Sequence, residues 1–461
     1  MEEKIAQIID ETVELLEQRN YVALKNLINT LMPADLALLF EEFDKKEIVI
    51  VFRLLSKELA AETFAYLDTQ SRRHLLDSIS DREIREVFDL LFIDDTVDII
   101  EEMPANVVTR ILSNTDPETR KSINDILKYP EDSAGSLMTI EYVSLKKHMT
   151  VAEAIAKIRR EGSAKETVYT CYVTDKDRVL LGLVDVSVLL TSDDNLVIED
   201  IMETNVVSVN THEDREVVAR AFNKYAFIAL PVVDNEQRLV GIVTVDDAID
   251  VLNEEITEDM SHMAAMQPIE GTYFKTSVFN HAKNRILWLL ILMISSTVTG
   301  MILQDYENAI SILPVLVSSI PMLMNTGGNS GSQSATMIIC GLASGEIRFS
   351  DIIKVIFKEF RISIFVSIFL AIGNFLRIII MGNLNLLGDL GGVSSLTIAL
   401  IVSLSLVLVV IIAKFIGCTL PLLAHKIGLD PALMAAPIIT TIVDACAVLI
   451  YFKIAVTWLN I

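Results

Sequence analysis

The sequence contains few cysteines and no motif for nucleotide hydrolysis, and these absences exclude several classes of protein. Its four cysteines lie far apart in a chain of 461 residues and form no CxxC pair. This spacing predicts reduced structural thiols and argues against disulfides or a zinc site. Neither a GxxxxGKS/T loop nor an aspartyl-phosphate motif is visible, which argues against an ATP-driven pump. We expect a protein that is not an enzyme.

Charge is also missing from one part of the chain and concentrated in another. No Asp, Glu, Lys or Arg occurs from Asn308 to Gly345. Residues 1–274 hold 27 basic and 54 acidic side chains, a net charge of −27, whereas the remainder carries +3. The first part is expected to be soluble, to attract cations and to repel nucleic acid. A merely solubilising acidic surface is the alternative.

A period of 24 residues runs through the first part of the chain. Each unit opens with a polar segment such as MPAD or LSKE, which suits the start of a helix. Helical repeats of this length predict an all-α superhelical domain over residues 1–130. Apolar residues that share a phase of the repeat are Leu31, Leu55, Ile79, Met103 and Leu127, and in a second phase Phe40, Phe64, Phe88 and Leu112.

A second repeat follows over residues 131–250. Residues 137–158 align with 201–222, and residues 173–190 align with 232–249. Each copy reads as strand, helix, two strands and helix, which predicts an α/β unit of two copies, 131–200 and 201–250. This pattern resembles a CBS-domain pair, a regulatory module that often binds adenine nucleotides or metal ions.

The CBS resemblance implies at most one nucleotide site. In that family a Gly-x-x-Thr-x-x-Asp signature contacts the nucleotide ribose, and the second copy carries it as Gly241, Thr244 and Asp247. The first copy departs from it, with Asp185 and Val188 at the Thr and Asp positions. ATP is the candidate ligand of the second copy.

Residues 246–270 form the predicted connecting helix. Asp247, Asp250, Glu254 and Glu258 follow one another at spacings of three, four and four, so they line one stripe of this helix. Like charges at these spacings repel, and few basic residues are near, so cations are the expected counter-charge. A solvated helix face is the alternative.

Five apolar segments predict a transmembrane domain over residues 275–461. Each reaches the ~20 residues that a membrane-spanning helix needs. Basic residues flank the first segment and the second connection, which puts the N-terminal domains in the cytoplasm and the C-terminus outside. The expected spans are 286–304, 309–341, 353–381, 395–423 and 433–459.

The second span contains the polar segment NTGGNSGSQS, residues 325–334. We expect Gly327, Gly328 and Gly331 to let the backbone bend and present carbonyl oxygens, because broken helix in a membrane must line protein or water. The amide of Asn329 adds a neutral oxygen, and oxygen ligands suit hard cations. The alternative is close helix packing through Gly327 and Gly331, which have the GxxxG spacing.

The fifth span carries a carboxylate, Asp444, about 16 Å along the helix from Leu433. Ionisable groups at this depth are costly and are usually functional. Pro437 is expected to free the Leu433 carbonyl one turn earlier, and Thr441 adds a hydroxyl. A protonated Asp444 is the alternative.

A single carboxylate among neutral oxygens favours a partly hydrated Mg²⁺, without excluding Mn²⁺ or Co²⁺. The candidate pore ligands are Asp444, Asn329, Gly328 and Thr441.

The order of these parts resembles the MgtE magnesium channels along essentially the whole chain. The specific motifs are PMLMNTGGNSGSQSAT in the second span and DPALMAAPIITTIVD in the fifth. The resemblance implies a homodimer in the cell membrane, with a pore on its two-fold axis formed by these spans. It also implies that Asp444 of each subunit holds hydrated Mg²⁺ and that the connecting helix plugs the cytoplasmic mouth.

The same resemblance implies regulatory Mg²⁺ ions between acidic groups of the cytosolic and membrane domains. At low Mg²⁺ these groups repel one another, and bound Mg²⁺ favours a compact, closed state. Ala226 departs from the family, because relatives can carry an acidic residue there. The implied regulatory residues are Asp94, Asp98, Glu216, Asp247, Asp250, Glu255, Glu258, Asp259 and Asp430.

Two other functions remain open on the sequence. A cation-coupled divalent-metal carrier would have the same motifs, because the sequence does not separate a channel from a carrier. A membrane-anchored, nucleotide-sensing CBS regulator would explain residues 137–250 but would leave Asp444 without a role.

Overall fold

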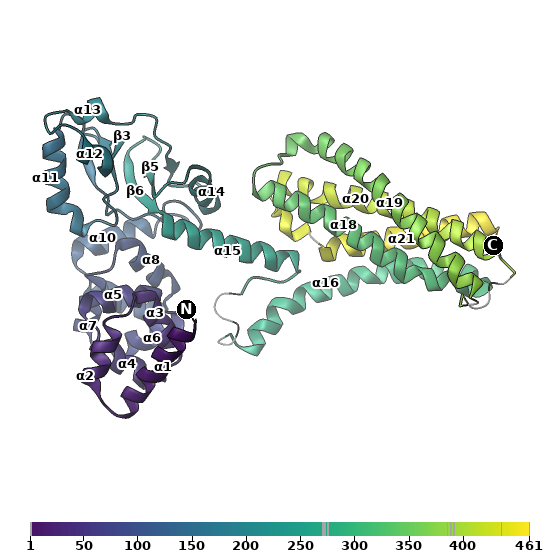
Figure 1. Ribbon diagram of the computed structural model, residues 1–461, viewed down its shortest axis with the longest axis horizontal. Helices are drawn as coiled ribbons and strands as arrows, with labels where there is room; N and C mark the ends of the chain where they lie inside the picture. Colours follow the sequence, from purple (N-terminus) through teal and green to yellow (C-terminus); the bar gives the residue numbers. More distant parts are fainter. Residues whose placement is uncertain are drawn as a thin grey trace. The chain divides into compact units, whose positions relative to one another are not determined.

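The computed structural model describes residues 2–269, 273, 276–384, 386–387, 390, 392–434 and 436–460. The chain divides into two compact units, Met1–Asn253 and Glu254–Ile461 (Figure 1). The first unit contains a stack of short helices followed by two small β-sheets. The second is built from long helices.

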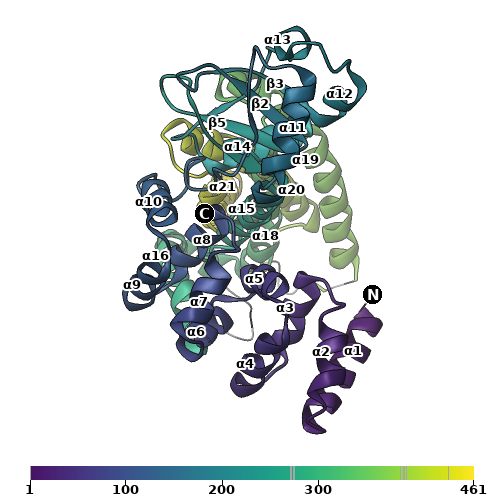
Figure 2. The same ribbon diagram turned by 90° about the vertical axis from the view of Figure 1, so that its left-hand side faces the viewer.

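The helices of the first unit follow the period predicted from the sequence. α3, α5, α7 and α9 each begin 24 residues after the one before, so the predicted stack is confirmed and each repeat holds two helices. Figure 2 shows the helices following one another in a curve. Their bounds are α1 (Glu2–Glu17), α2 (Tyr21–Ile28), α3 (Pro33–Glu41), α4 (Lys45–Leu54), α5 (Lys57–Tyr66), α6 (Thr69–Ser78), α7 (Asp81–Phe88), α8 (Ile93–Glu102), α9 (Ala105–Asn114) and α10 (Pro117–Ile126).

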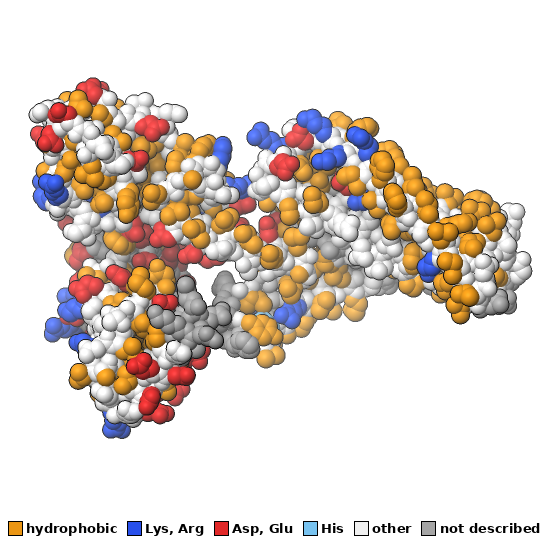
Figure 3. All heavy atoms as spheres, in the orientation of Figure 1, with side chains coloured by type: hydrophobic (Ala, Val, Ile, Leu, Met, Phe, Trp, Pro, Cys, Tyr) orange, Lys and Arg blue, Asp and Glu red, His pale blue; other side chains and the backbone are white. Residues whose placement is uncertain are grey.

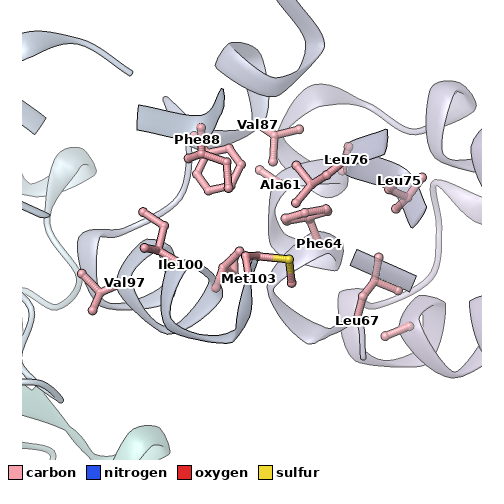
Figure 4. Close-up of a cluster of buried hydrophobic side chains, with 14 of the residues drawn as sticks. Ala61, Phe64, Leu67, Leu75, Leu76, Val87, Phe88, Val97, Ile100 and Met103 are labelled. Carbon is pink, nitrogen blue, oxygen red and sulfur yellow. The ribbon is translucent and has the colours of Figure 1, made fainter. Parts of the chain in front are cut away.

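Phenylalanines that recur in the repeat form the centre of this stack. Phe40, Phe52, Phe64 and Phe88 are all buried. Edge-to-face contacts join consecutive rings in this series, with centroids 6.5, 6.2 and 5.9 Å apart. Figure 4 shows Phe64 and Phe88 next to Met103 in this core. Such ring pairs add to the burial of apolar surface, so they tie each repeat to the next.

Two three-stranded sheets confirm the predicted CBS pair. In each sheet the first two strands are parallel and the last two are antiparallel. The first copy contains β1 (Ser144–Lys146), α11 (Val151–Glu161), β2 (Thr170–Thr174), β3 (Leu180–Asp185) and α12 (Val186–Thr191). A short helix, α13 (Ile198–Ile201), leads to β4 (Val209–Asn210), α14 (Arg215–Tyr225), β5 (Ala229–Val233), β6 (Leu239–Thr244) and α15 (Val245–Met263).

The segment that precedes the first strand of each copy pairs with the other copy. Thr139, before β1, pairs with Ile242 of β6 through backbone bonds of 2.8 and 2.9 Å. Glu203, before β4, pairs in the same way with Leu183 of β3. A Cβ atom on Gly241 would lie 2.7 Å from the Thr139 carbonyl oxygen, so this pairing requires glycine there.

The second unit contains helices long enough to cross a membrane. Four segments are both long and apolar enough among the described residues: Val278–Asp305, Phe349–Asn383, Ser395–Lys426 and Pro431–Leu459. The main helices are α16 (Val278–Asp305), α17 (Glu307–Ile312), α18 (Ile320–Ala343), α19 (Ile352–Asn383), α20 (Ser395–Lys426) and α21 (Ala436–Leu459).

The predicted second span, 309–341, is divided into several elements. It consists of α17, a 3₁₀ segment (Pro314–Ser319) and α18. α18 has 24 residues, about 36 Å of helix, which is enough to cross a bilayer. Because of its polar segment, α18 is not one of the four segments that are apolar enough to be counted. The prediction of five crossings therefore stays a prediction.

We expect Phe64→Ala to destabilise the helical stack by about 3–5 kcal/mol, because it removes a fully buried ring that contacts two others. Thermal unfolding of the detergent-solubilised full chain, followed with limited proteolysis of the stack, measures this loss. Leu38→Ala is the control, because Leu38 lies on α3 with 51% of its surface exposed. Equal protease resistance in the two variants would contradict the prediction.

Candidate functional site

The polar segment of the second unit is part of an unbroken helix. α18 continues without interruption through residues 325–334, so the predicted backbone bend is wrong. The three glycines instead give neighbouring helices room to approach. A Cβ on Gly327 would lie 2.6 Å from Val409 of α20, and one on Gly328 would lie 2.9 Å from Thr440 of α21. Close packing, the alternative interpretation, is therefore what these glycines provide.

The amides of the segment lie on another face of α18. Asn325, Asn329 and Gln333 are exposed, and their spacing of four residues puts them in one stripe. Asn329 Nδ2 donates to Asn325 Oδ1 over 3.1 Å. Uncovered amides at membrane depth would be costly in lipid. This stripe therefore indicates contact with water, with an ion or with a second protein surface.

Asp444 lies on α21, which packs antiparallel to α18. Gly331 faces Ile439 and Gly327 faces Val443, so residues later in α18 meet residues earlier in α21. In this register Asp444 is level with Thr326, about one turn from the level that Asn329 shares with Thr441. Three of the four candidate pore residues therefore lie within neighbouring turns. Gly328 is at this level too but faces Thr440.

The Asp444 side chain is half-buried, and no donor among the described residues bonds to it. Pro437 is the second residue of α21, so it lies in the first turn of the helix, and the predicted release of the Leu433 carbonyl stays a prediction. The hydroxyls of Thr440 and Thr441 both donate to the Pro437 carbonyl, over 2.9 and 2.8 Å. Their oxygens keep lone pairs that can accept a bond from a hydrated ion.

A buried ionic group inside the second unit escaped the sequence analysis. Lys414 of α20 and Glu359 of α19 meet at Ser334 of α18, and all three side chains are buried. The sequence did indicate such a group, because Lys414 is a charged residue within the apolar segment 395–423. A charge at that position requires a partner.

Acidic side chains gather in the first unit where α8 meets the CBS pair and the start of α15 (Figure 3). Asp94 is only 7% exposed, and Asp98 keeps a solvent-exposed face. Asp247 is half-buried and accepts a bond of 2.6 Å from the Thr244 hydroxyl. Glu166, which follows α11, was not predicted, and its buried Oε2 atom has no hydrogen-bond partner among the described residues.

Burial and mutual repulsion raise the pKa values of the carboxyl groups in this acidic cluster. Burial is the larger cause and neighbouring carboxylates the smaller one; together they raise the pKa of Asp98 to about 7 and that of Glu166 to about 8. Burial raises the pKa of Asp247 to about 7, and the Thr244 bond opposes this shift. The pKa of Asp94 is also raised, chiefly by burial and then by Asp247. A divalent cation would offset the repulsion that accompanies ionisation.

The end of α15 contacts the membrane domain within the second unit. Asp430 Oδ2 lies 2.6 Å from His262 Nδ1, and Asp430 Oδ1 accepts a bond of 2.8 Å from the Ala432 amide. Glu258 lies one turn before His262, with 3.9 Å between Oε1 and Nε2. The structure thus brings Asp430 to the predicted plug helix, and His262 is the residue that the sequence analysis missed.

The other predicted regulatory residues are placed as follows. Asp250 is exposed on α15, and burial raises its pKa. Glu255 and Asp259 are half-buried later on the same helix. Glu216 of α14 forms an ion pair with Arg220 one turn later and is not among the causes of the raised pKa values in the cluster.

In the residues that the structure describes, no three His, Cys, Asp or Glu side chains converge closely enough to hold a metal ion as they stand. Of the nucleotide signature, Thr244 and Asp247 bond to each other, whereas Gly241 is needed for the pairing between the two copies. These predicted ligand roles stay predictions.

Three family models match the chain. The model described as a divalent cation transporter matches residues 320–454, the MgtE intracellular N domain matches 31–132, and the CBS domain matches 134–193 and 198–254. The magnesium transporter MgtE of Thermus thermophilus is 35% identical and covers 99% of this chain and 98% of the relative. That of Bacillus subtilis is 31% identical and covers 98% of each.

Solved structures also match the chain, among them two that cover about half of its length. The cytosolic domain of an Mg²⁺ channel MgtE in complex with ATP is 36% identical, with a TM-score of 0.51, and covers 53% of this chain and 99% of that one. The soluble part of a magnesium transporter is 27% identical, also with a TM-score of 0.51, and covers 54% and 99%.

We expect the metal-free protein to lose stability as pH rises from about 5 to about 8, because carboxylates with raised pKa values bind more protons when folded than when unfolded over this window. Thermal unfolding in EDTA at stepped pH measures the effect. The Asp98→Asn, Glu166→Gln double variant should show a flatter dependence. An identical slope in parent and variant would contradict the prediction.

Proposed function

Because the chain belongs to the MgtE family, we propose that it carries Mg²⁺ across the cell membrane along a path lined by α18 and α21. MgtE proteins are transporters, and we assign this chain no catalytic role. The observation that supports this path is the position of Asp444, half-buried within α21 and level with the exposed amide stripe of α18. An apolar transport path would not require a carboxylate at that depth.

The ligand chemistry favours a hydrated ion. Mg²⁺ requires octahedral geometry and keeps several of its waters, which a single carboxylate and neutral oxygens can hold. Asp444 supplies the charge, and the side chains of Asn329 and Thr441 supply oxygens that bond to coordinated water. Gly328 contributes by letting α21 approach α18.

The exposed amide stripe also supports a homodimer. In one chain Asn325, Asn329 and Gln333 are uncovered, yet lipid would leave their hydrogen-bonding groups without partners. A second copy that presents the same stripe across a two-fold axis would enclose a polar path, and closed two-fold pairs are the commonest assemblies. Each subunit then contributes one Asp444.

The protein is a membrane protein with cytosolic N-terminal domains. We propose that α18 crosses the membrane in addition to the four apolar segments, and five crossings place the C-terminus outside. The proposed domain boundaries are 1–130 for the helical stack, 131–250 for the CBS pair, 246–270 for the plug and 275–461 for the membrane domain.

The acidic cluster supports gating by intracellular Mg²⁺. When Mg²⁺ is scarce, Asp94, Asp98 and Asp247 either repel one another or hold protons. Bound Mg²⁺ would replace those protons and draw α8 and the start of α15 together. A shift from mostly open to mostly closed needs about 5.5 kcal/mol, which several weak sites can supply jointly.

At the far end of α15, Mg²⁺ bound near Glu255, Glu258 and Asp259 would act on Asp430. The contact between Asp430 and His262 supports a direct link from the plug to the membrane domain. Glu216 is the proposed ligand at the CBS level.

Two finer points of function follow from the same residues. A related cytosolic domain is described with ATP, so we propose ATP as a ligand of Gly241, Thr244 and Asp247 in the second CBS copy.

A cation-coupled carrier remains the alternative to a channel. Current that reverses at the Mg²⁺ equilibrium potential would support a channel, and dependence on a Na⁺ or H⁺ gradient would support a carrier.

Asp444→Ala should abolish Mg²⁺ uptake into proteoliposomes, because it removes the one carboxylate of the proposed path. A Mg²⁺-sensitive dye inside the vesicles measures the flux. Asp305→Ala is the matched control, since Asp305 is exposed at the end of α16. Uptake by Asp444→Ala at the parent rate would exclude the proposed path.

The Asp247→Ala, Asp250→Ala double variant should keep the protein open at Mg²⁺ concentrations that close the parent, because it removes two carboxylates of the cluster. Patch recording from giant proteoliposomes with stepped bath Mg²⁺ tests this. Glu11→Ala with Glu14→Ala removes the same charge at the same spacing from exposed positions on α1 and should close normally. Normal closure of both would argue against this gate.

A further inference from the structure

The buried ionic group of the membrane domain joins three helices through one hydroxyl. Ser334 Oγ donates to Glu359 Oε2 over 2.6 Å and accepts a bond of 3.0 Å from Lys414 Nζ. The Lys414 and Glu359 charges are 3.6 Å apart, so the serine bridges them. Exposed fractions are 2% for Ser334, 5% for Lys414 and 9% for Glu359. We call these residues the Lys–Ser–Glu triad.

The triad fixes α18 along its own axis. An ammonium and a carboxylate in an apolar helix bundle are tolerable only as a pair. Sliding α18 past α19 or α20 would break the serine bridge and leave the buried charges imperfectly solvated. The triad thus resists axial movement that apolar contacts alone would allow.

The close packing of α18 against α20 beside the triad also restricts movement of α18. A Cβ on Gly417 would overlap the Gly331 carbonyl oxygen, and a Cβ on Gly331 would lie 3.0 Å from the Ala413 carbonyl oxygen. Lys414 therefore sits directly beside the closest approach of α20 to α18. The small residues bring the two backbones together, and the charges set where along the helix they meet.

We propose that Lys414 is a positioning residue for transport, acting through Ser334 and Glu359 to hold α18 where Asn329 lies about one turn from Asp444. Ser334 lies five residues from Asn329, about 7.5 Å along α18. The inference rests on the proposed function, because it assigns the triad a role in the path of α18 and α21. Lys414 itself does not touch the ion.

A charge-neutral double variant separates positioning from folding. Lys414→Met with Glu359→Gln leaves no uncompensated charge, so the dimer should fold with a melting temperature near that of the parent. Mg²⁺ flux per folded dimer should nevertheless fall about tenfold, since misplacement of ligands by ~1 Å can have such an effect. The ratio of Mg²⁺ to Mn²⁺ flux should also change. The swapped pair, Lys414→Glu with Glu359→Lys, should restore both.

Two further variants keep the test decisive if a double variant fails to fold. Ser334→Ala removes only the bridge and should lower the flux and alter the ion ratio in the same direction. Ser367→Ala is the control: Ser367 is fully buried on α19, and its hydroxyl donates only to the Ile364 carbonyl of its own helix.

The outcomes are distinguishable. An active parent together with parent-like flux and ion ratio in the neutral double variant and in Ser334→Ala would overturn this inference alone. A folded parent dimer that takes up no Mg²⁺ would overturn the proposed function and this inference with it.

Discussion

A carboxylate removed from bulk water must find a counter-charge, a proton or a ring of oxygens, and this constraint governs each part of the protein. In the acidic cluster of the first unit, burial raises the pKa of Asp247, and the bond from the Thr244 hydroxyl opposes this shift. The counter-charge of Glu359 is the ammonium group of Lys414. No lysine and no hydrogen-bond donor among the described residues pairs with Asp444, and we propose a passing cation as its counter-charge. To these three environments we assign the proposed roles in regulation, in positioning α18 and in conduction.

Much of the fold could be predicted because it repeats. The 24-residue period fixed the helical stack, since a buried ring such as Phe64 must recur at the same place in each unit. The two CBS copies were visible for the same reason. Internal repetition allows a single sequence to be compared with itself, and that comparison revealed both domains.

The membrane domain does not repeat, and the predictions made for it were less accurate. The glycines of residues 325–334 suggested a broken helix, but they serve packing while the amides occupy the opposite face. The composition of residues 325–334 cannot distinguish a broken helix from close helix packing, because glycines and amides are compatible with both. The triad was harder still, since Ser334, Glu359 and Lys414 come from three helices. Lys414 was nevertheless a detectable anomaly.

The pairing between the two CBS copies has a mechanical consequence. Thr139 pairs with Ile242, and Glu203 with Leu183, so the last strand of each copy is hydrogen-bonded to a residue that precedes the first strand of the other copy. Rotation of one CBS copy against the other would break these backbone hydrogen bonds. We therefore expect an ion or nucleotide that binds either copy to act on both copies together.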